Sequence, residues 1–102
     1  MFTMLMGLQS VQAMNVDEFI LVCDIQRILD TLETNEISLS MQPIMNDGHV
    51  KHIYVSCQHR GSSYTCSRTF DIEGLLCEDD HEEYFGGRVA ALIHKCEKHM
   101  EA

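Results

Sequence analysis

The fold is decided by residues 37–71, ISLSMQPIMNDGHVKHIYVSCQHRGSSYTCSRTFD, in which apolar and polar side chains alternate. A period of two residues is typical of a β-strand with one buried face. The turn signal Asn46-Asp47-Gly48 divides this stretch, and a second turn is expected at residues 60–63. The pattern predicts three antiparallel strands, at about residues 37–42, 50–59 and 64–71.

The pairing of the second and third strands follows if residues 60–63 form a four-residue loop. Cys57 then lies opposite Cys66, and Ile53 lies opposite Phe70. In this register the apolar faces of both strands lie on the same side of the sheet, so we expect this register in the folded protein.

An amphipathic helix is predicted on each side of the strands. The first is expected to begin at Asn15, where Glu18 has capping-box spacing, and to end near residues 33–35. The second follows a run of acidic residues, in which Asp80 and Glu83 have the same spacing. The apolar stripes are Ile25, Ile28, Leu29 and Leu32 in the first helix and Phe85, Val89, Leu92, Cys96 and Met100 in the second.

Gly86 and Gly87 lie within the second helical pattern. Inside a helix each glycine costs about 1 kcal/mol relative to alanine. The pair therefore predicts either the true start of this helix or a close approach of the helix to the sheet.

The predicted order is helix, three antiparallel strands, helix. Two amphipathic helices on one face of a three-stranded meander form a two-layer α+β sandwich. The chain has 102 residues, which suits one domain, and we expect this domain at residues 14–102.

Residues 1–13, MFTMLMGLQSVQA, are apolar and uncharged. They lack the basic region of a signal peptide and are too short to span a bilayer. We expect an apolar N-terminal arm that packs on its own domain or on a second copy, and a cytoplasmic protein. The alternative is an extension upstream of a second start at Met14.

The chain carries 16 acidic and 7 basic residues, which give a formal net charge of −9. An acidic surface repels phosphates, so direct binding to nucleic acid or to an anionic membrane is disfavoured. The expected partner is a protein with a basic surface. The seven cations show no run of three: Arg27, Lys51, Arg60, Arg68, Arg88, Lys95 and Lys98.

The acidic residues are concentrated at residues 71–83, which contain no Lys or Arg. We call this segment the acidic run and expect it to engage a cationic surface through electrostatic steering. The alternative is a solvated loop with a helix cap. The candidate partner-binding residues of the run are Asp71, Glu73, Glu78, Asp79, Asp80, Glu82 and Glu83.

The outward face of the sheet is a second candidate surface. It is expected to be rich in hydroxyl groups and poor in charge, with Tyr54 and His52 as candidate partner-binding residues. The alternative is an ordinary solvated face of an antiparallel sheet. The expected outward residues are Ser38, Ser40, Gln42, His52, Tyr54, Ser56, Gln58, Thr65, Ser67 and Thr69.

The five cysteines are odd in number and unevenly spaced, which favours reduced thiols. Cys57, Cys66 and Cys96 fall on expected core faces, where a thiol behaves as a small apolar group. We therefore expect neither a metal nor a cofactor, although a Cys57–Cys66 disulfide is conceivable under oxidising conditions. No Gly-rich phosphate loop, GxSxG or HExxH motif occurs, so an enzyme is not expected.

The order α-β-β-β-α resembles that of the double-stranded RNA-binding domain. In that family the last helix opens with a basic cluster that contacts phosphates. The corresponding residues here, 78–83, read EDDHEE and have the opposite charge. The resemblance therefore implies a topology and not an RNA-binding function.

We expect a small, non-enzymatic interaction domain that blocks a cationic or nucleic-acid-binding surface of a partner protein. In size, acidity and lack of a catalytic motif the chain is similar to small phage-encoded inhibitors of host machinery, including anti-CRISPR proteins. One alternative is a homo-oligomeric scaffold that associates through the N-terminal arm or an edge strand. A further alternative is a zinc or redox-sensing module.

Overall fold

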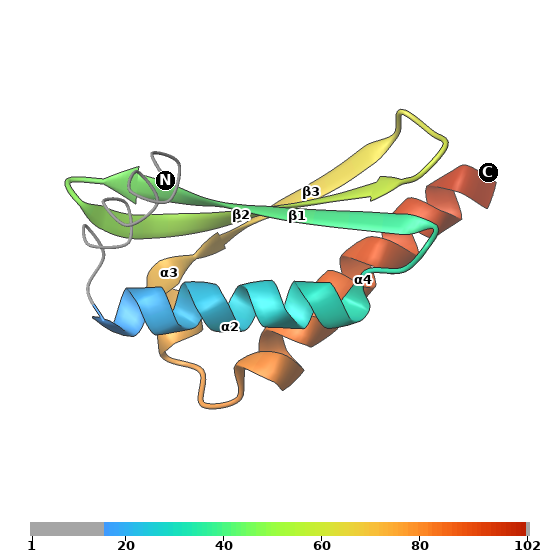
Figure 1. The fold of residues 1–102 in the computed structure, drawn as a ribbon. Coiled ribbons are helices and arrows are strands. Elements are labelled where there is room, and N and C mark those ends of the chain that lie inside the picture. Colours follow the sequence, from blue (N-terminus) through green and yellow to red (C-terminus); the bar gives the residue numbers. More distant parts are fainter. Residues whose placement is uncertain (1–15, 102) are drawn as a thin grey trace, which may run out of the picture.

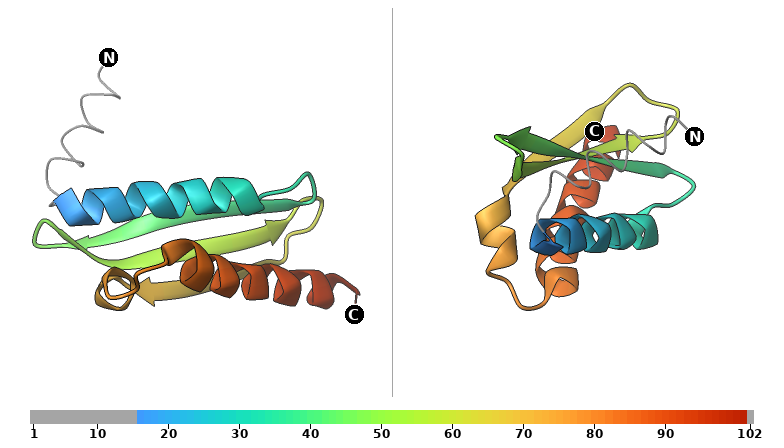
Figure 2. Two further views of the ribbon diagram at one scale, coloured as in Figure 1. Left: turned by 90° about the horizontal axis from the view of Figure 1, so that it is seen from below. Right: turned by 60° about the vertical axis from the view of Figure 1, so that its left-hand side comes forward.

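The computed structural model describes residues 16–101, with side chains described up to residue 98. The sheet forms one layer, and the two long helices form a second layer on one of its faces (Figure 1; Figure 2). The predicted two-layer α+β sandwich is therefore confirmed. The elements are α2 (Val16–Leu32), β1 (Ile37–Asn46), β2 (His49–His59), β3 (Thr65–Asp71), α3 (Ile72–Leu76) and α4 (His81–Glu101).

The structure adds one short helix to the predicted elements, and some predicted features lie outside the described residues. The short helix α3 was not predicted, because a segment of 5 residues is too short to show a helical period. The N-terminal arm at residues 1–13 and the helix start at Asn15 lie outside the described residues, as does the side chain of Met100.

The three strands are antiparallel and lie in the order β1-β2-β3. Cys57 pairs with Cys66 and Ile53 pairs with Phe70, so the predicted register is confirmed. The turn between β1 and β2 consists of Asp47 and Gly48, whose φ angles are 54° and 78°. Two positive φ angles define the hairpin turn that fits the right-handed twist of the strands.

Strand β2 contains a β-bulge at Lys51. Ile44 pairs with His52 and Met45 pairs with Val50, so Lys51 is an extra residue in the ladder. In strict alternation Val50 would share the outward face with His52, but the bulge turns Val50 into the core, where its side chain is 1% exposed. The bulge was not predicted from the sequence.

The core lies between the sheet and the two long helices. The rings of Phe70 and Phe85 meet there with their centroids 4.8 Å apart, which joins β3 to α4. The buried apolar side chains are Leu21, Ile25, Ile28, Leu29, Ile37, Leu39, Val50, Ile53, Val55, Cys57, Cys66, Phe70, Ile72, Leu75, Phe85, Val89, Leu92 and Cys96.

The glycine pair lies inside α4, five residues after its start at His81, so neither prediction for it is correct. A Cβ atom built on Gly86 would lie 3.7 Å from Cγ2 of Ile28, in α2. The small side of α4 therefore faces the other helix and not the sheet. A Cβ atom on Gly87 would meet no atom within 4 Å.

Candidate partner-binding site

A groove of about 770 Å³ opens where the first turn of α2, the β1–β2 turn and α3 come together. These segments lie at the left-hand end of Figure 1, and the left panel of Figure 2 shows them at one end of the molecule. We call it the hairpin groove. Its lining includes Glu18, Ile44, Met45, Asp71, Glu73 and Leu76.

Glu18 supplies a buried carboxylate to the wall of the groove. Only 5% of this residue is exposed, and its Oε1 accepts a hydrogen bond from the backbone N–H of Val50 at 3.0 Å. Its Oε2 lies 3.4 Å from Nδ1 of His49. The bulge in β2 thus brings a backbone donor to a carboxylate that would otherwise be costly to bury.

The groove also exposes apolar surface. Ile44 and Met45 are each 40% exposed, and Leu76 of α3 is 42% exposed. All three belong to the lining of the hairpin groove, together with polar and charged residues. Contiguous apolar surface with a polar rim is typical of a protein-binding site.

Three of the predicted partner-binding residues lie at this groove. His52, Asp71 and Glu73 all line it, and Nδ1 of His52 is 3.8 Å from Oδ1 of Asp71. The structure thus joins the outward face of the sheet to the start of the acidic run. Lys51 also lines the groove, so the wall carries three carboxylates and one lysine.

Tyr54 does not line the hairpin groove. It pairs with Gln42 on β1 and with Thr69 on β3, in the middle of the outward face, and is 37% exposed. Among the described residues no helix covers this face (Figure 2). The predicted row of outward residues is confirmed, and Tyr54 stands within it as a separate candidate anchor.

The rest of the acidic run lies in the loop after α3 and in the first turn of α4. Glu78, Asp79, Asp80, Glu82 and Glu83 are all exposed. Oδ1 of Asp80 accepts a hydrogen bond from the backbone N–H of Glu83 at 3.1 Å, as the capping spacing predicts. Asp80 therefore stabilises α4, whereas Glu78 and Asp79 project from the loop without such a role.

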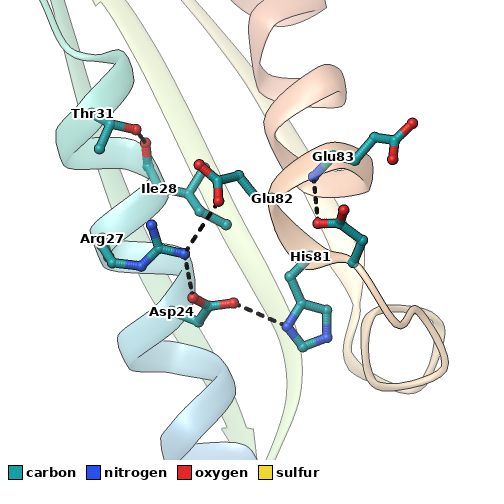
Figure 3. A network of polar contacts seen from close by, with 8 residues as sticks. Asp24, Arg27, Ile28, Thr31, His81, Glu82 and Glu83 are labelled. Carbon is teal, nitrogen blue, oxygen red and sulfur yellow. Dashed lines mark hydrogen bonds and ion pairs between the residues drawn. The ribbon is translucent and has the colours of Figure 1, made fainter.

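A polar network joins the acidic run to α2 (Figure 3). Asp24 accepts a hydrogen bond from Arg27 at 2.7 Å, and its other oxygen lies 3.1 Å from Nδ1 of His81. Arg27 also lies 3.8 Å from Glu82. The hydrogen bond from Arg27 is the main cause that holds the pKa of Asp24 below its ordinary value, and His81 acts in the same direction.

The three core cysteines are free thiols, and Sγ of Cys96 lies 4.0 Å from the carbonyl oxygen of Cys57. Burial, reinforced by the neighbouring thiols, raises the pKa of Cys57 to about 12. Such a thiol is a poor nucleophile and a poor metal ligand. Within residues 16–98, no group of three or more His, Cys, Asp or Glu side chains is arranged to hold a metal ion.

No protein-family model matches the chain, and neither a curated protein nor a solved structure matches it significantly. None of the helices between residues 16 and 101 is long and apolar enough to cross a membrane. The class is therefore defined by geometry alone, as an α+β sandwich with an open antiparallel sheet and a groove at one end.

Sequence reasoning missed Glu18, Ile44, Met45 and Leu76 as parts of the site. Glu18 has capping-box spacing, which accounts for an acidic residue in the first turn of the helix even if its side chain is exposed to solvent. Val50 offered a signal, because it is an apolar residue at a position that strict alternation places on the outward face.

Proposed function

We propose that this protein is a small, non-catalytic interaction domain that binds a partner protein through the hairpin groove and the acidic run. The main supporting observation is that exposed apolar side chains and carboxylates line the same groove. A complementary partner presents Lys or Arg beside an apolar side chain, because the apolar part fills the groove and the cation meets Asp71 and Glu73.

The acidic run extends this surface. Of its seven carboxylates, only that of Glu82 lies within 4 Å of a described Lys or Arg, namely Arg27. The other six have no Lys or Arg within that distance among the described residues, which suits them to steer a basic partner toward the groove. In its more specific form the protein is an inhibitor that covers a cationic or nucleic-acid-binding surface, as small phage-encoded inhibitors do.

A displayed library of random peptides, selected on the full chain, tests this proposal and does not require the partner to be identified first. We expect enriched peptides to combine Lys or Arg with Leu, Ile, Met or Phe. Selection of peptides without a cation, or of none at all, would contradict the proposal.

Charge reversal locates the binding surface. The triple variant Glu73→Lys, Glu78→Lys, Asp79→Lys leaves the Asp80 cap and the Glu82 ion pair intact, and we expect about tenfold weaker binding and a smaller salt dependence. Its matched control is Asp30→Lys, Glu36→Lys, Glu97→Lys, at exposed positions elsewhere. Equal loss in both triples would mean that only net charge matters.

The apolar part of the site has its own pair of variants. Leu76→Ser removes an exposed side chain of the groove, whereas Ile20→Ser removes one that is 58% exposed on α2 and does not line the groove. We expect only the first to weaken peptide binding. Unchanged binding with Leu76→Ser would leave the acidic run as the sole contact.

A homo-oligomeric scaffold is the second candidate. The specific observation is that β1 and β3 are both edges of the sheet, and within the described residues neither has a partner on its outer side. Open edges pair readily with another chain, although Pro43 weakens β1 for this purpose. Light scattering on the full chain decides between the two functions, because a strict monomer at high concentration excludes the scaffold.

A further inference from the structure

Three of the seven cations gather in a second, shallow groove between β3 and α4. Arg68 comes from β3, and Arg88 and Lys95 come from α4, about two turns apart. They line a space of about 320 Å³ together with Ser67 and Leu92, and no Asp or Glu belongs to this lining. We call it the basic groove. The cations are scattered in the sequence because they lie on different elements.

The two arginines are held by aromatic rings. Cζ of Arg68 lies 5.0 Å from the centroid of the Phe70 ring, and Cζ of Arg88 lies 5.1 Å from that of Tyr84. A guanidinium that stacks on a ring keeps its N–H groups at the edge, where they can bind another group. The stacking therefore limits the freedom of both side chains before any ligand arrives.

Acidic partners for these three cations are missing from the part of the chain that the structure describes. Within residues 16–98, no carboxylate oxygen lies within 4 Å of the charged nitrogens of Arg68, Arg88 or Lys95, although Arg27 and Arg60 both have such contacts. Glu83 lines the neighbouring hollow beside Arg88 but forms no ion pair with it. Three like charges thus lie together in a chain whose net charge is −9.

We infer that the basic groove binds the phosphate group of a small molecule. A planar guanidinium group donates a pair of hydrogen bonds in a geometry that matches two phosphate oxygens, and Lys95 adds a third positive charge. The volume suits a small molecule. A nucleic acid is disfavoured as the ligand, because the remaining surface is strongly acidic and repels a polyanion. This site lies apart from the hairpin groove and does not depend on the proposed function.

The test is a titration of the full chain, labelled with ¹⁵N, in a chloride buffer at constant ionic strength. The probes are inorganic phosphate and adenosine monophosphate. We expect saturable shifts of the backbone signals of residues 67, 68, 88 and 95. Tighter binding of the nucleotide identifies a phosphate ester as the ligand, and equal binding identifies free phosphate, each in support of the site. Linear shifts without saturation, or shifts spread over the surface, would overturn it.

Variants separate this site from general attraction of anions. The double variant Arg68→Gln, Arg88→Gln is expected to weaken phosphate binding about tenfold or more, since two pairs of charge-assisted hydrogen bonds are lost. The matched control Arg60→Gln removes a cation that already pairs with Glu33 at 3.7 Å and is expected to bind as the unaltered chain does.

Two further measurements make the outcome decisive. The double variant Arg68→Lys, Arg88→Lys keeps both charges but loses the paired hydrogen bonds of the guanidinium groups. Its affinity for phosphate is expected to lie between those of the unaltered chain and the glutamine variant. An affinity equal to that of the unaltered chain would show general attraction of anions and overturn the site. Light scattering with and without phosphate checks for a second copy: a dimer that phosphate dissociates would mean that carboxylates of another chain occupy the groove, which would also overturn the proposal.

Discussion

The carboxylate of Glu18 in α2 accepts a hydrogen bond from the backbone N–H of Val50 in β2, at 3.0 Å and across 32 positions of the sequence. This bond connects the first turn of the helix to the end of the β1–β2 hairpin. Because both residues are buried, the bond is shielded from water, and removal of the Glu18 side chain takes this acceptor away from the Val50 N–H.

Glu18→Ala is expected to lower the free energy of unfolding by about 2 kcal/mol, since a buried N–H loses its acceptor. Glu18→Gln keeps a carbonyl oxygen at the same place and is expected to cost about half as much. Urea denaturation measures both values. The control Asp17→Ala changes an exposed acid in the same helical turn, and an equal loss there would assign the effect to the helix end instead.

The contact of Asp24 with Arg27 and His81 predicts a dependence of stability on pH. The pKa of Asp24 is lower in the folded protein than its ordinary value of 3.8, so the folded state binds this proton more weakly than the unfolded state. The stabilisation is therefore complete above the unfolded pKa and is lost as the pH falls through the folded pKa.

Asp24→Asn measures this contribution. We expect the variant to be less stable than the unaltered chain by about 1 kcal/mol or less at pH 7, and the difference to vanish near pH 2. Urea denaturation across this range gives the comparison, with Glu36→Gln as an exposed control. A difference that stays constant with pH would show that the carboxylate charge is not the cause.

The cysteines are expected to react in two classes. Cys23 and Cys77 are exposed, whereas Cys57, Cys66 and Cys96 are buried. Because the pKa of Cys57 is raised from 9.0 to about 12, its thiolate fraction at pH 8 is about a thousandfold lower than that of an ordinary thiol. Alkylation by iodoacetamide, followed by mass spectrometry, is expected to add two groups quickly and three more only in denaturant. Rapid addition of five groups would contradict the buried positions.

Gly87→Ala is expected to raise the free energy of unfolding by about 0.5–1 kcal/mol. The residue lies inside α4 and an added Cβ meets no atom within 4 Å, so only the helical preference changes. Gly61→Ala serves as the contrast, because Gly61 has a φ of 87°, which strains an alanine. Thermal denaturation of the two variants should give shifts of opposite sign.

The strands and their register follow from the sequence because each depends on local pattern. The alternation before and after residues 60–63 leaves one register that places Cys57 against Cys66, and the structure has it. The hairpin turn likewise depends on two adjacent residues, Asp47 and Gly48. Local chemistry of this kind can be interpreted from a short stretch of chain alone.

The grooves do not follow from the sequence because they depend on distant elements. The hairpin groove needs the bulge at Lys51, which shifts the alternation by one position, and a helix too short to predict. The basic groove joins Arg68 to Arg88, which are 20 positions apart and are brought together only by the packing of α4 on β3. Neither groove corresponds to a repeating pattern of residues that could be recognised in a single sequence.

The hydrogen bond to Glu18 makes hydrogen exchange of the Val50 amide depend on the docking of α2. Its exchange with deuterium requires α2 to lift away from the hairpin, because its acceptor belongs to the helix and not to a strand. Amide protons in the middle of β2 require the sheet itself to open. The ratio of these two exchange rates therefore reports how often α2 undocks from the hairpin. A ligand that closes the hairpin groove should slow hydrogen exchange of the Val50 amide alone.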